Sequence, residues 1–402
     1  MIKPTRTHLS DLRGATRIAV DATVGVTDLV ERMHATIRRV PGIVGKAPQN
    51  PTRGITGLVY QSVRGVTRVV GRGLDAGLAP VIPLLPEGET TPGREAFVAA
   101  LNGVYGDYLA RTGNPLAVAM SVRRDGRRFD PADAADDASV SKPNGRLLLL
   151  IHGLCLNDLH WTREGHNHGE ALAKDHGYTS LYLHYNSGLH VSINGRDLAA
   201  LLEDLVERWP HPVEELAIVG HSMGGLVARS ACHYGRLADH RWTQHLRKLV
   251  FLGTPHHGAP LERGGNLLDF VMGVSPYSAP FTRLGKMRSA GITDLRHGNV
   301  VDEDWDGRDR FALSGDKRQP VPLPEKVQCY AVAATLGKRR DLLSERLLGD
   351  GLVPLTSALG HHKKPDRALG FAKSHQWIGY EMGHLELLSR PEVYAPLRDW
   401  LA

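Results

Sequence analysis

From residue 146 onward, short runs of apolar residues alternate with segments whose apolar residues recur at helical spacing. The runs are typical of strands that are buried on both faces, and they occupy residues 146–153, 179–186, 215–220, 248–253 and 327–334. Helical spacing marks two of the intervening segments, 195–208 and 223–237. Because strands and helices alternate, the sequence predicts an α/β fold with a mostly parallel sheet and helices on both faces.

The N-terminal residues follow a different pattern. Residues 13–33 and 53–73 align at a shift of forty positions, and both contain Arg-Gly-x-Thr and Gly-Val-Thr. In each copy the apolar residues recur at helical spacing, so we predict two related amphipathic helices. We therefore divide the chain into an N-terminal helical extension with a Pro-rich linker, residues 1–92, and an α/β domain, residues 93–402.

Two further features belong to the α/β domain. A third helix over 94–112 and a hairpin that turns at Asp125 and Gly126 are expected to open the domain. The interval 259–325 is too long for a simple crossover between strands and is rich in Gly and Pro. We expect this interval to contain an inserted cap over the functional site.

Positive charge is concentrated in the N-terminal extension. Residues 1–75 hold twelve Lys and Arg and five Asp and Glu, so their net charge of +7 exceeds the +6 of the whole chain. These helices have three alternative uses: docking on the α/β domain, forming a homodimer, or lying on a membrane, a storage-lipid granule or a polyester granule. The arginines are interleaved with apolar residues and lack an aromatic platform, which argues against nucleic acid.

The overall composition, 42% hydrophobic and 23% charged, is typical of a soluble globular protein. The first twenty residues lack the apolar core of a signal peptide, and no apolar run reaches the length of a membrane span. The three cysteines are widely spaced, which favours reduced thiols over a disulfide framework. We expect a cytoplasmic protein, with peripheral association at a membrane or granule surface as the alternative.

The stretch AIVGHSMGG at 217–225 combines the end of a buried strand, a very short turn and the start of a helix. Ser222 lies on that turn, where a serine must adopt a strained backbone that is tolerated when nearby residues lack a Cβ. Gly220 and Gly224 lie two residues before and after it. This G-x-S-x-G pattern is the nucleophile elbow, so we predict that Ser222 is a catalytic nucleophile.

A serine hydroxyl needs a base to activate it, and the base needs an acid to orient it. On this type of sheet the acid follows the serine and the histidine comes last. Asp350 in LLGDGLVP and His384 in YEMGHLELL occur in that order. Negative charge that develops on a substrate also requires two backbone donors. We expect one at Met223, directly after the nucleophile, and one at Leu154, after the early strand.

With these motifs the chain resembles the lipase and esterase branch of the α/β-hydrolase superfamily, including bacterial triacylglycerol lipases and the GPI inositol-deacylase-like group. The resemblance covers residues 112–402 and rests on HGL (152–154), GHSMGG (220–225), GTPHHGAP (253–260), DGLVPLTSALG (350–360) and GHLELL (383–388). It implies an α/β-hydrolase fold with Ser222 as nucleophile, Asp350 as acid and His384 as base. It also implies oxyanion-hole amides at Leu154 and Met223. It implies nothing about the N-terminal extension.

Other residues compete for the roles of acid and base. Asp341 and Asp366 are the nearest rival carboxylates, but neither lies in a D-G-x-V-P context. Asp350 could also simply form an Asx turn before Gly351. The rival histidines precede or lie within a predicted last strand at 368–379, whereas His384 follows it; these rivals are His361, His362 and His375. We expect His152 and His221 to be hydrogen-bonded residues of their turns.

The remaining candidate chemistry is weak. Cys155 is an alternative nucleophile, although the serine motif is the better one. Histidine pairs at 166 and 168, 256 and 257, and 361 and 362 suggest metal ligands, but the chain has no H-E-x-x-H and no paired C-x-x-C. It also has no G-x-G-x-x-G or P-loop between a strand and a helix. We predict no metal and no cofactor.

Together these features predict a serine hydrolase that cleaves carboxylic esters, of lipids or of other acyl compounds, through an acyl-enzyme on Ser222. A thioesterase or an acyltransferase would use the same three residues, and the sequence does not separate them. An inactive hydrolase-fold protein that binds through its basic helices is a further alternative. The intact Ser222, Asp350 and His384 disfavour it.

Overall fold

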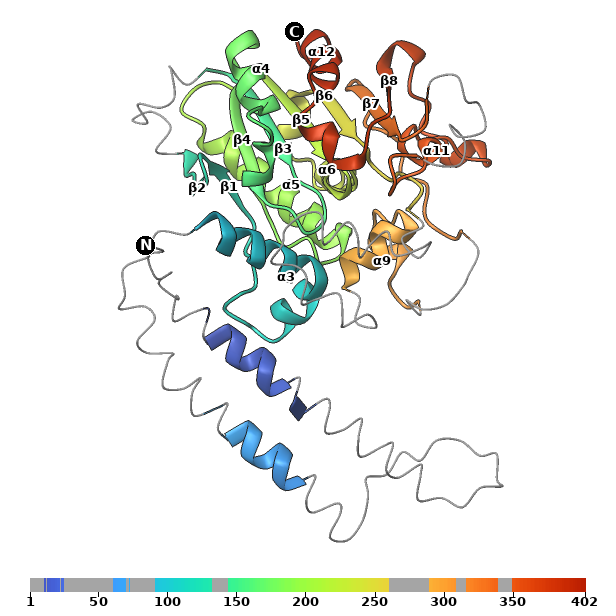
Figure 1. The fold of residues 1–402 in the computed structure, drawn as a ribbon. Coiled ribbons are helices and arrows are strands. Elements are labelled where there is room, and N and C mark those ends of the chain that lie inside the picture. The colour runs from blue at the N-terminus through green and yellow to red at the C-terminus, as the bar shows by residue number, and fades with distance from the viewer. Residues whose placement is uncertain are drawn as a thin grey trace, which may run out of the picture. The chain divides into compact units, whose positions relative to one another are not determined.

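The structure is a computed structural model, and it describes residues 11, 13–21, 23–24, 61–69, 72, 91–131, 144–259, 289–308, 316–338 and 349–402. The chain forms two compact units. The first comprises Met1–Thr90 and Arg111–Leu116, and the second comprises Thr91–Ala110 and Ala117–Ala402. Figure 1 shows the elements of both units.

The second unit is built around a sheet of eight strands in the order β2-β1-β4-β3-β5-β6-β7-β8. The strands are β1 (Ser121–Arg124), β2 (Arg127–Arg128), β3 (Arg146–Ile151), β4 (Thr179–His184), β5 (Glu215–His221), β6 (Leu246–Leu252), β7 (Gln328–Thr335) and β8 (Gln376–Tyr380). Strands β3 to β8 pair in parallel, and β1 pairs antiparallel with β4 and β2. The predicted mostly parallel sheet is therefore confirmed.

Helices and short 3₁₀ segments connect these strands. The α-helices are α3 (Pro92–Arg111), α4 (His168–His176), α5 (Val191–Arg208), α6 (Met223–Leu237), α7 (Trp242–His245), α9 (Ala290–His297), α11 (Leu355–Ala358) and α12 (Pro391–Trp400). The 3₁₀ segments are η3 (Asp158–Trp161), η5 (Asp302–Asp304), η6 (Pro365–Arg367), η7 (Lys373–His375) and η8 (His384–Leu388).

The sheet has an apolar core on each face, because successive side chains of a strand point to opposite faces. In β3, Leu147 and Leu149 join the core that contains residues of α5 and α6. Leu148 and Leu150 join the other core, together with residues of α4 and α12. The predicted helices on both faces are thus present (Figure 1). This layering places the carboxyl ends of β3, β5, β6 and β7 at one edge of the sheet.

Helix α5 begins at Val191, four residues before the predicted start at 195. Its N-cap residue, His190, makes no side-chain cap; instead, the amide of Val191 donates to Asp294 Oδ2 at 2.8 Å. Because the cap comes from a segment about a hundred residues away, local sequence signals cannot reveal it. A side chain at Gly195 would lie 2.1 Å from Ser230 Oγ, so this glycine allows α5 and α6 to pack closely.

Of the two elements at the ends of the sheet, one is confirmed and the other is partly wrong. The hairpin of β1 and β2 turns at Asp125 and Gly126, as predicted, and both residues have positive φ. The predicted last strand at 368–379 is wrong in its first part, because β8 begins at Gln376. Phe371 lies in the part of the segment that forms no strand. It is buried and packs edge-on against Phe251, so the apolar residue in this part of the sequence reflects packing in the core and not strand pairing.

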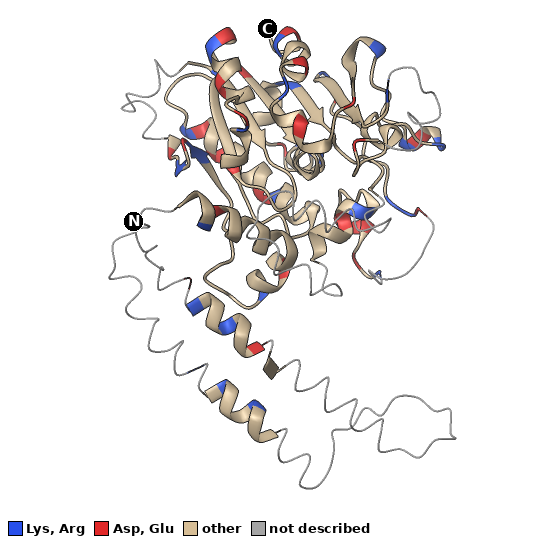
Figure 2. Ribbon diagram, viewed as in Figure 1, with Lys and Arg blue, Asp and Glu red and all other residues tan. Residues whose placement is uncertain are grey.

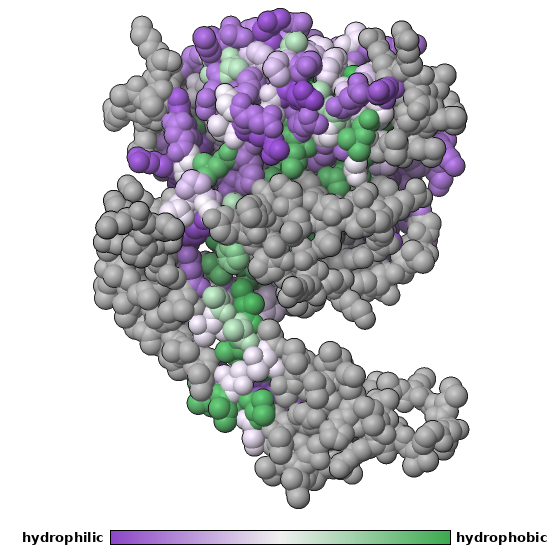
Figure 3. Space-filling model, in the orientation of Figure 1, coloured by the Kyte–Doolittle hydropathy of each residue, from purple (hydrophilic) through white to green (hydrophobic). Residues whose placement is uncertain are grey.

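In the first unit, residues 13–21 and 61–69 are helical, which agrees with the predicted N-terminal helices. Asn114 Nδ2 donates to the carbonyl of Gly14 at 3.1 Å, within this unit. The helix at 61–69 carries arginines and no acidic residue (Figure 2). Figure 3 shows hydrophobic surface on the described parts of these helices. Within the ranges that the structure describes, no helix has the length and apolarity to cross a membrane.

The expected cap falls only partly on described residues. Residues 260–288 and 309–315 lie outside them, as does the Pro-rich linker. The described part of the interval 259–325 contains α9, which is attached to the sheet's carboxyl edge: the amide of Gly291 donates to the carbonyl of Gly188 at 3.0 Å. Whether this interval acts as a cap stays a prediction.

Candidate active site

The predicted nucleophile turn is present between β5 and α6. Ser222 has φ 53° and ψ −121°, a conformation that costs free energy for any residue with a Cβ. A Cβ at Gly220 would lie 2.7 Å from the backbone of Gly225, and a Cβ at Gly224 would lie 2.2 Å from the carbonyl oxygen of Ile151. The glycines are therefore required by the close approach of α6 to β5 and β3, and not only by the turn itself.

Asp350 and His384 form a buried pair. His384 Nδ1 lies 2.6 Å from Asp350 Oδ2, and both side chains are almost fully buried, with exposed fractions of 4% and 1%. The amide of His384 also donates to the carbonyl of Asp350 at 3.2 Å. Asp350 Oδ1 accepts from the amides of Leu352 and Val353 at 3.0 and 2.8 Å. Asp350 thus forms the Asx turn and holds the imidazole as well, because its two oxygens take different partners.

The residues after β6 bring His384 beside the serine turn. The amide of Ser222 donates to the carbonyl of Leu252 at 2.8 Å. Gly253 follows, and a Cβ there would lie 3.1 Å from both Nδ1 and Cε1 of His384. From the other side, the ring of His221 lies 4.7 Å from the ring of His384, and its Nε2 lies 3.2 Å from the His384 carbonyl oxygen. The structure therefore gathers Ser222, His384 and Asp350 at the carboxyl edge of the sheet.

The loop after β3 runs directly against the serine. A Cβ at Gly153 would come within 3.0 Å of the Ser222 Cβ. Leu154 is the next residue, and the loop is fixed on either side of it. The Tyr185 hydroxyl donates to the carbonyl of His152 at 2.8 Å, and the Cys155 amide donates to Ser187 Oγ at 3.1 Å.

The two expected amide donors come from different elements. Leu154 belongs to this loop, and its side chain is fully buried. Met223 is the first residue of α6, where an amide has no acceptor within its own helix. Both residues adjoin Ser222, one through Gly153 and one directly along the chain. Their role as oxyanion donors stays a prediction.

The rival acids and bases lie elsewhere. Asp366 is exposed in η6, and Asp341 falls outside the described residues. His362 Nε2 pairs with Asp316 at 3.3 Å. His375 Nδ1 lies 3.2 Å from the carbonyl oxygen of Cys329, near the amino end of β7 and so at the edge of the sheet opposite Ser222. His361 is exposed.

Two histidines next to the site are held in the neutral form. Burial lowers the pKa of His152 to about 3, and its Nδ1 lies 2.9 Å from the carbonyl oxygen of Gly153. Burial lowers the pKa of His221 well below its ordinary value, and the neighbouring His384 lowers it further. A neutral His221 adds no positive charge beside His384, which must itself gain a proton if it is to act as a base.

The other candidate nucleophile and the candidate metal ligands are occupied by structural roles. Burial raises the pKa of the Cys155 thiol to about 12, so this thiol carries no thiolate near neutral pH. His166 Nε2 lies 2.8 Å from His168 Nδ1, whose Nε2 lies 3.0 Å from the carbonyl oxygen of Leu387. Among the described residues, no group of three or more His, Cys, Asp or Glu is arranged to hold a metal.

One residue of the site was missed by the sequence analysis. Gly253 has φ +58°, and a side chain there would meet both His384 and Leu387. The signal was available, since this glycine ends a predicted strand and begins GTPHHGAP. Its contact partner, however, lies about 130 residues further along the chain, and nothing in the local sequence identifies it.

Comparisons with known proteins address the fold. Residues 142–317 match the family model described as PGAP1-like alpha/beta domain. No curated protein sequence matches the chain. The match spans β3 to β6, with the serine turn and the loop after β3. Together with the strand order, it supports an α/β-hydrolase fold.

Several solved structures are similar to parts of the chain at low identity. The mature form of the lipase BlEst2 from Bacillus licheniformis is 18% identical, and the alignment covers 70% of this chain and 98% of that chain with a TM-score of 0.38. Lipase B from Aspergillus fumigatus is 11% identical over 72% and 56% of the two chains, with a TM-score of 0.41. A lipase-esterase related protein from Clostridium acetobutylicum is 13% identical over 64% and 95%, with a TM-score of 0.36.

Proposed function

We propose that this protein is a serine hydrolase that cleaves carboxylic esters through an acyl-enzyme on Ser222. The observation that carries the proposal is the hydrogen bond of 2.6 Å between His384 and the buried Asp350, formed where His384 packs beside the strained serine turn. An acid, an imidazole and a serine in this arrangement can activate the serine hydroxyl. No cofactor takes part in the proposed reaction.

In the first half of the reaction, Ser222 Oγ bonds to the ester carbonyl carbon and its proton passes to His384 Nε2. Asp350 holds the proton on Nδ1 and stabilises the charged imidazolium. The carbonyl oxygen becomes negative, and the amides of Leu154 and Met223 donate hydrogen bonds to it. When the bond to the alcohol oxygen breaks, His384 returns its proton to that oxygen and the alcohol leaves.

In the second half, water replaces the alcohol. His384 takes a proton from the water, whose oxygen bonds to the acyl carbon. The bond to Ser222 Oγ then breaks, His384 returns the proton to the serine, and the carboxylic acid leaves. We propose lipids or other acyl esters as substrates.

The test is hydrolysis of p-nitrophenyl esters over a series of acyl chain lengths, in solution and in emulsion. We expect turnover by the wild-type protein without added metal or cofactor. Replacement of Ser222 by Ala should abolish it while leaving the thermal unfolding temperature nearly unchanged. A wild-type protein that is folded but cleaves no ester of the series would contradict the proposal.

A further inference from the structure

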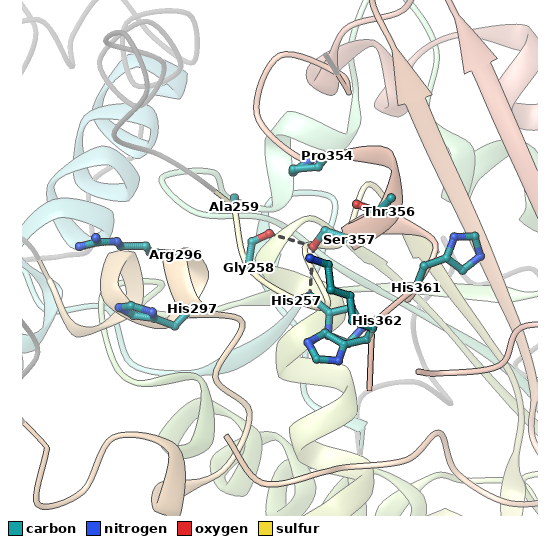
Figure 4. Close-up of a pocket in the computed structure, with 11 residues that line it drawn as sticks. His257, Gly258, Ala259, Arg296, His297, Pro354, Thr356, Ser357, His361 and His362 are labelled. Carbon is teal, nitrogen blue, oxygen red and sulfur yellow. Dashed lines mark hydrogen bonds between the residues drawn. The ribbon is translucent and has the colours of Figure 1, made fainter. Parts of the chain in front are cut away.

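A second feature of the carboxyl edge is a pocket of about 770 Å³. Its walls come from the turn after β6, the last turn of α9, the α11 segment and residues 361–363 (Figure 4). The turn after β6 continues from Gly253, which contacts His384, and the α11 segment follows the loop of Asp350. The pocket therefore shares its supporting segments with the candidate active site.

The chemistry of the lining is unusual for an acyl pocket. Among the described residues that line it, only Ala259 and Pro354 have apolar side chains, and none is an Asp or a Glu. Lys363 and Arg296 are cationic, and four further lining residues are histidines: His257, His297, His361 and His362. Lipid acyl chains require apolar walls, whereas clustered donors without a carboxylate favour an anion.

The side chains divide into two groups. In Figure 4, Arg296 and His297 extend from α9 away from Ser357, whereas His257 and His362 lie together on the opposite side. The rings of the latter two are 4.8 Å apart between centroids. Lys363 follows His362 directly in the chain and therefore belongs to the same side of the pocket.

The frame of this side is held by hydrogen bonds. Ser357 Oγ accepts from the amide of His257 at 3.0 Å and donates to the carbonyl of Gly258 at 2.8 Å (Figure 4). Gly258 has φ +87°, and a Cβ there would lie 2.3 Å from the carbonyl oxygen of Arg296. Through these contacts the turn after β6 is bonded to α11 and packs closely against α9.

The charges behind the lining are mainly positive. Arg318 Nη2 lies 3.4 Å from His257 Nδ1 and 2.9 Å from Asp316 Oδ2. Asp316 also pairs with Arg367 and with His362. Burial would raise the pKa of Asp316, but the hydrogen bonds from Arg318 and Arg367 hold it far below its ordinary value. One carboxylate is thus shared by two guanidinium groups, which leaves excess positive charge beside the pocket.

We propose that this pocket binds a phosphate or carboxylate group, with the Lys363 ammonium as its main charged contact. The proposal deepens the proposed function, since the anion can be part of the ester substrate. It can also be a free phosphate that binds independently of ester cleavage. An anionic ester substrate and a free phosphate offer the same kind of charged group. Two experiments distinguish them: a binding arm, which measures phosphate binding, and a kinetic arm, which compares two esters.

In the binding arm, the full-length protein is titrated with inorganic phosphate and the heat of binding is measured by calorimetry. Lys363→Gln removes the proposed contact, and Lys364→Gln is the matched control, because this neighbouring lysine does not line the pocket. We expect the first substitution to weaken binding about tenfold, as for loss of one charged hydrogen bond. The second should change binding less than twofold. This arm needs no catalysis, so it stays readable if ester hydrolysis itself fails.

The kinetic arm compares two p-nitrophenyl esters of equal chain length, one ending in a carboxylate and one in its methyl ester. If the anion belongs to the substrate, Lys363→Gln raises KM about tenfold for the carboxylate ester alone. If phosphate binding responds to Lys363→Gln while the two KM values stay equal, the site takes free anions. The proposal is overturned if phosphate does not bind and neither ester responds, or if Lys363→Gln and Lys364→Gln have equal effects.

Discussion

Gly253 lies against the imidazole of His384. A Cβ at this position would come within 3.1 Å of His384 Nδ1 and Cε1 and within 2.7 Å of Leu387 Cδ1. The carbonyl of the preceding residue, Leu252, accepts the hydrogen bond from the Ser222 amide. The last residue of β6 therefore supports the serine, and the next residue, Gly253, lies against the imidazole.

Replacement of Gly253 by Ala should therefore reduce ester hydrolysis far more than it reduces stability. The new methyl group must displace His384 or Leu387, and a misplacement of about 1 Å in a catalytic group can cost roughly 10²-fold in rate. We expect kcat to fall by about that factor while KM changes little, as measured by steady-state kinetics on a soluble ester.

Gly370 provides the control for this substitution. It also has positive φ, 63°, but a Cβ there meets nothing within 4 Å. Gly370→Ala therefore carries only the cost of the left-handed conformation, roughly 1–2 kcal/mol of stability, and should keep kcat. Equal losses of kcat in the two variants would show that backbone strain, and not contact with His384, explains the effect.

The two oxygens of Asp350 predict a selective defect for Asp350→Asn. An asparagine can keep the turn through Oδ1, which accepts from Leu352 and Val353. Its amide group would face His384 Nδ1 as a donor, so the ring would carry its proton on Nε2 and could not accept the proton of Ser222. We expect kcat to fall roughly 10⁴-fold, as for the same change in serine proteases. The unfolding temperature should change little.

Asp366→Asn is the matched control, because this rival carboxylate is exposed in η6. It should leave kcat within twofold of the wild-type value. A loss of kcat smaller than tenfold in Asp350→Asn, or a loss of kcat larger than tenfold in Asp366→Asn, would mean that the acid has been assigned to the wrong residue.

Buried neutral histidines make the stability of the protein sensitive to mild acid. Burial lowers the pKa of four of them from 6.5: His152 to about 3, His168 to about 4, and His221 and His256 to well below 6.5. Unfolded histidines bind a proton near pH 6.5, whereas these bind one only at much lower pH. Their contribution is therefore complete above about pH 6.5 and is lost as the pH falls, by up to about 1.4 kcal/mol per pH unit for each.

Urea unfolding at pH 7.0 and pH 5.5 measures this effect, because most carboxyl groups titrate below that range. We expect a large drop in the free energy of unfolding between the two pH values. His168→Gln should make the drop in the free energy of unfolding smaller by the contribution of one buried histidine. His211→Gln, at an exposed position, should leave the drop unchanged. A pH dependence that is identical in all three proteins would contradict the assignment of buried neutral histidines.

The sequence predicts the elements that depend on local pattern. Helix α6 runs over the predicted residues 223–237, because its apolar spacing and the glycines of the serine turn are all encoded within one stretch. The start of α5 was misplaced because its cap comes from Asp294. The last strand was predicted too long because Phe371 packs into the core from a segment without strand pairing.

The same distinction applies to the site. Ser222 is predicted from its own turn, and Asp350 and His384 are predicted from short motifs in a fixed order. Their pairing, the contact of Gly253 with His384 and the position of Gly153 against Ser222 all join segments far apart in the chain. The pocket of Lys363 is assembled from four such segments, so its basic lining cannot be recognised before the fold is known.

The exposed valines of the helix at 61–69 predict that the protein binds to an anionic lipid surface. Val63, Val66 and Val69 are spaced three residues apart and are exposed by 42%, 65% and 69%. Arg64 and Arg68 lie on the same helix, and residues 61–69 contain no Asp or Glu. Apolar insertion and attraction to negative charge can act together on such a helix. We predict that the protein sediments with anionic liposomes and that high salt weakens this binding.

Val66→Ser combined with Val69→Ser should reduce sedimentation at least tenfold while activity on a soluble ester is kept. Leu237→Ser is the control, because this leucine is also 65% exposed but lies on α6. If the double variant instead loses ester activity or aggregates, the valines pack within the protein. If it changes the oligomeric state seen by size-exclusion chromatography, they form an interface between copies.

The most direct measurement of the central claim is labelling by a fluorophosphonate, which reacts with an activated serine, followed by mass spectrometry of the peptides. We expect one adduct per chain, located on Ser222, and we expect Ser222→Ala to show neither the adduct nor ester turnover while it unfolds at nearly the wild-type temperature. An adduct on a different residue, or wild-type turnover by Ser222→Ala, would contradict the account.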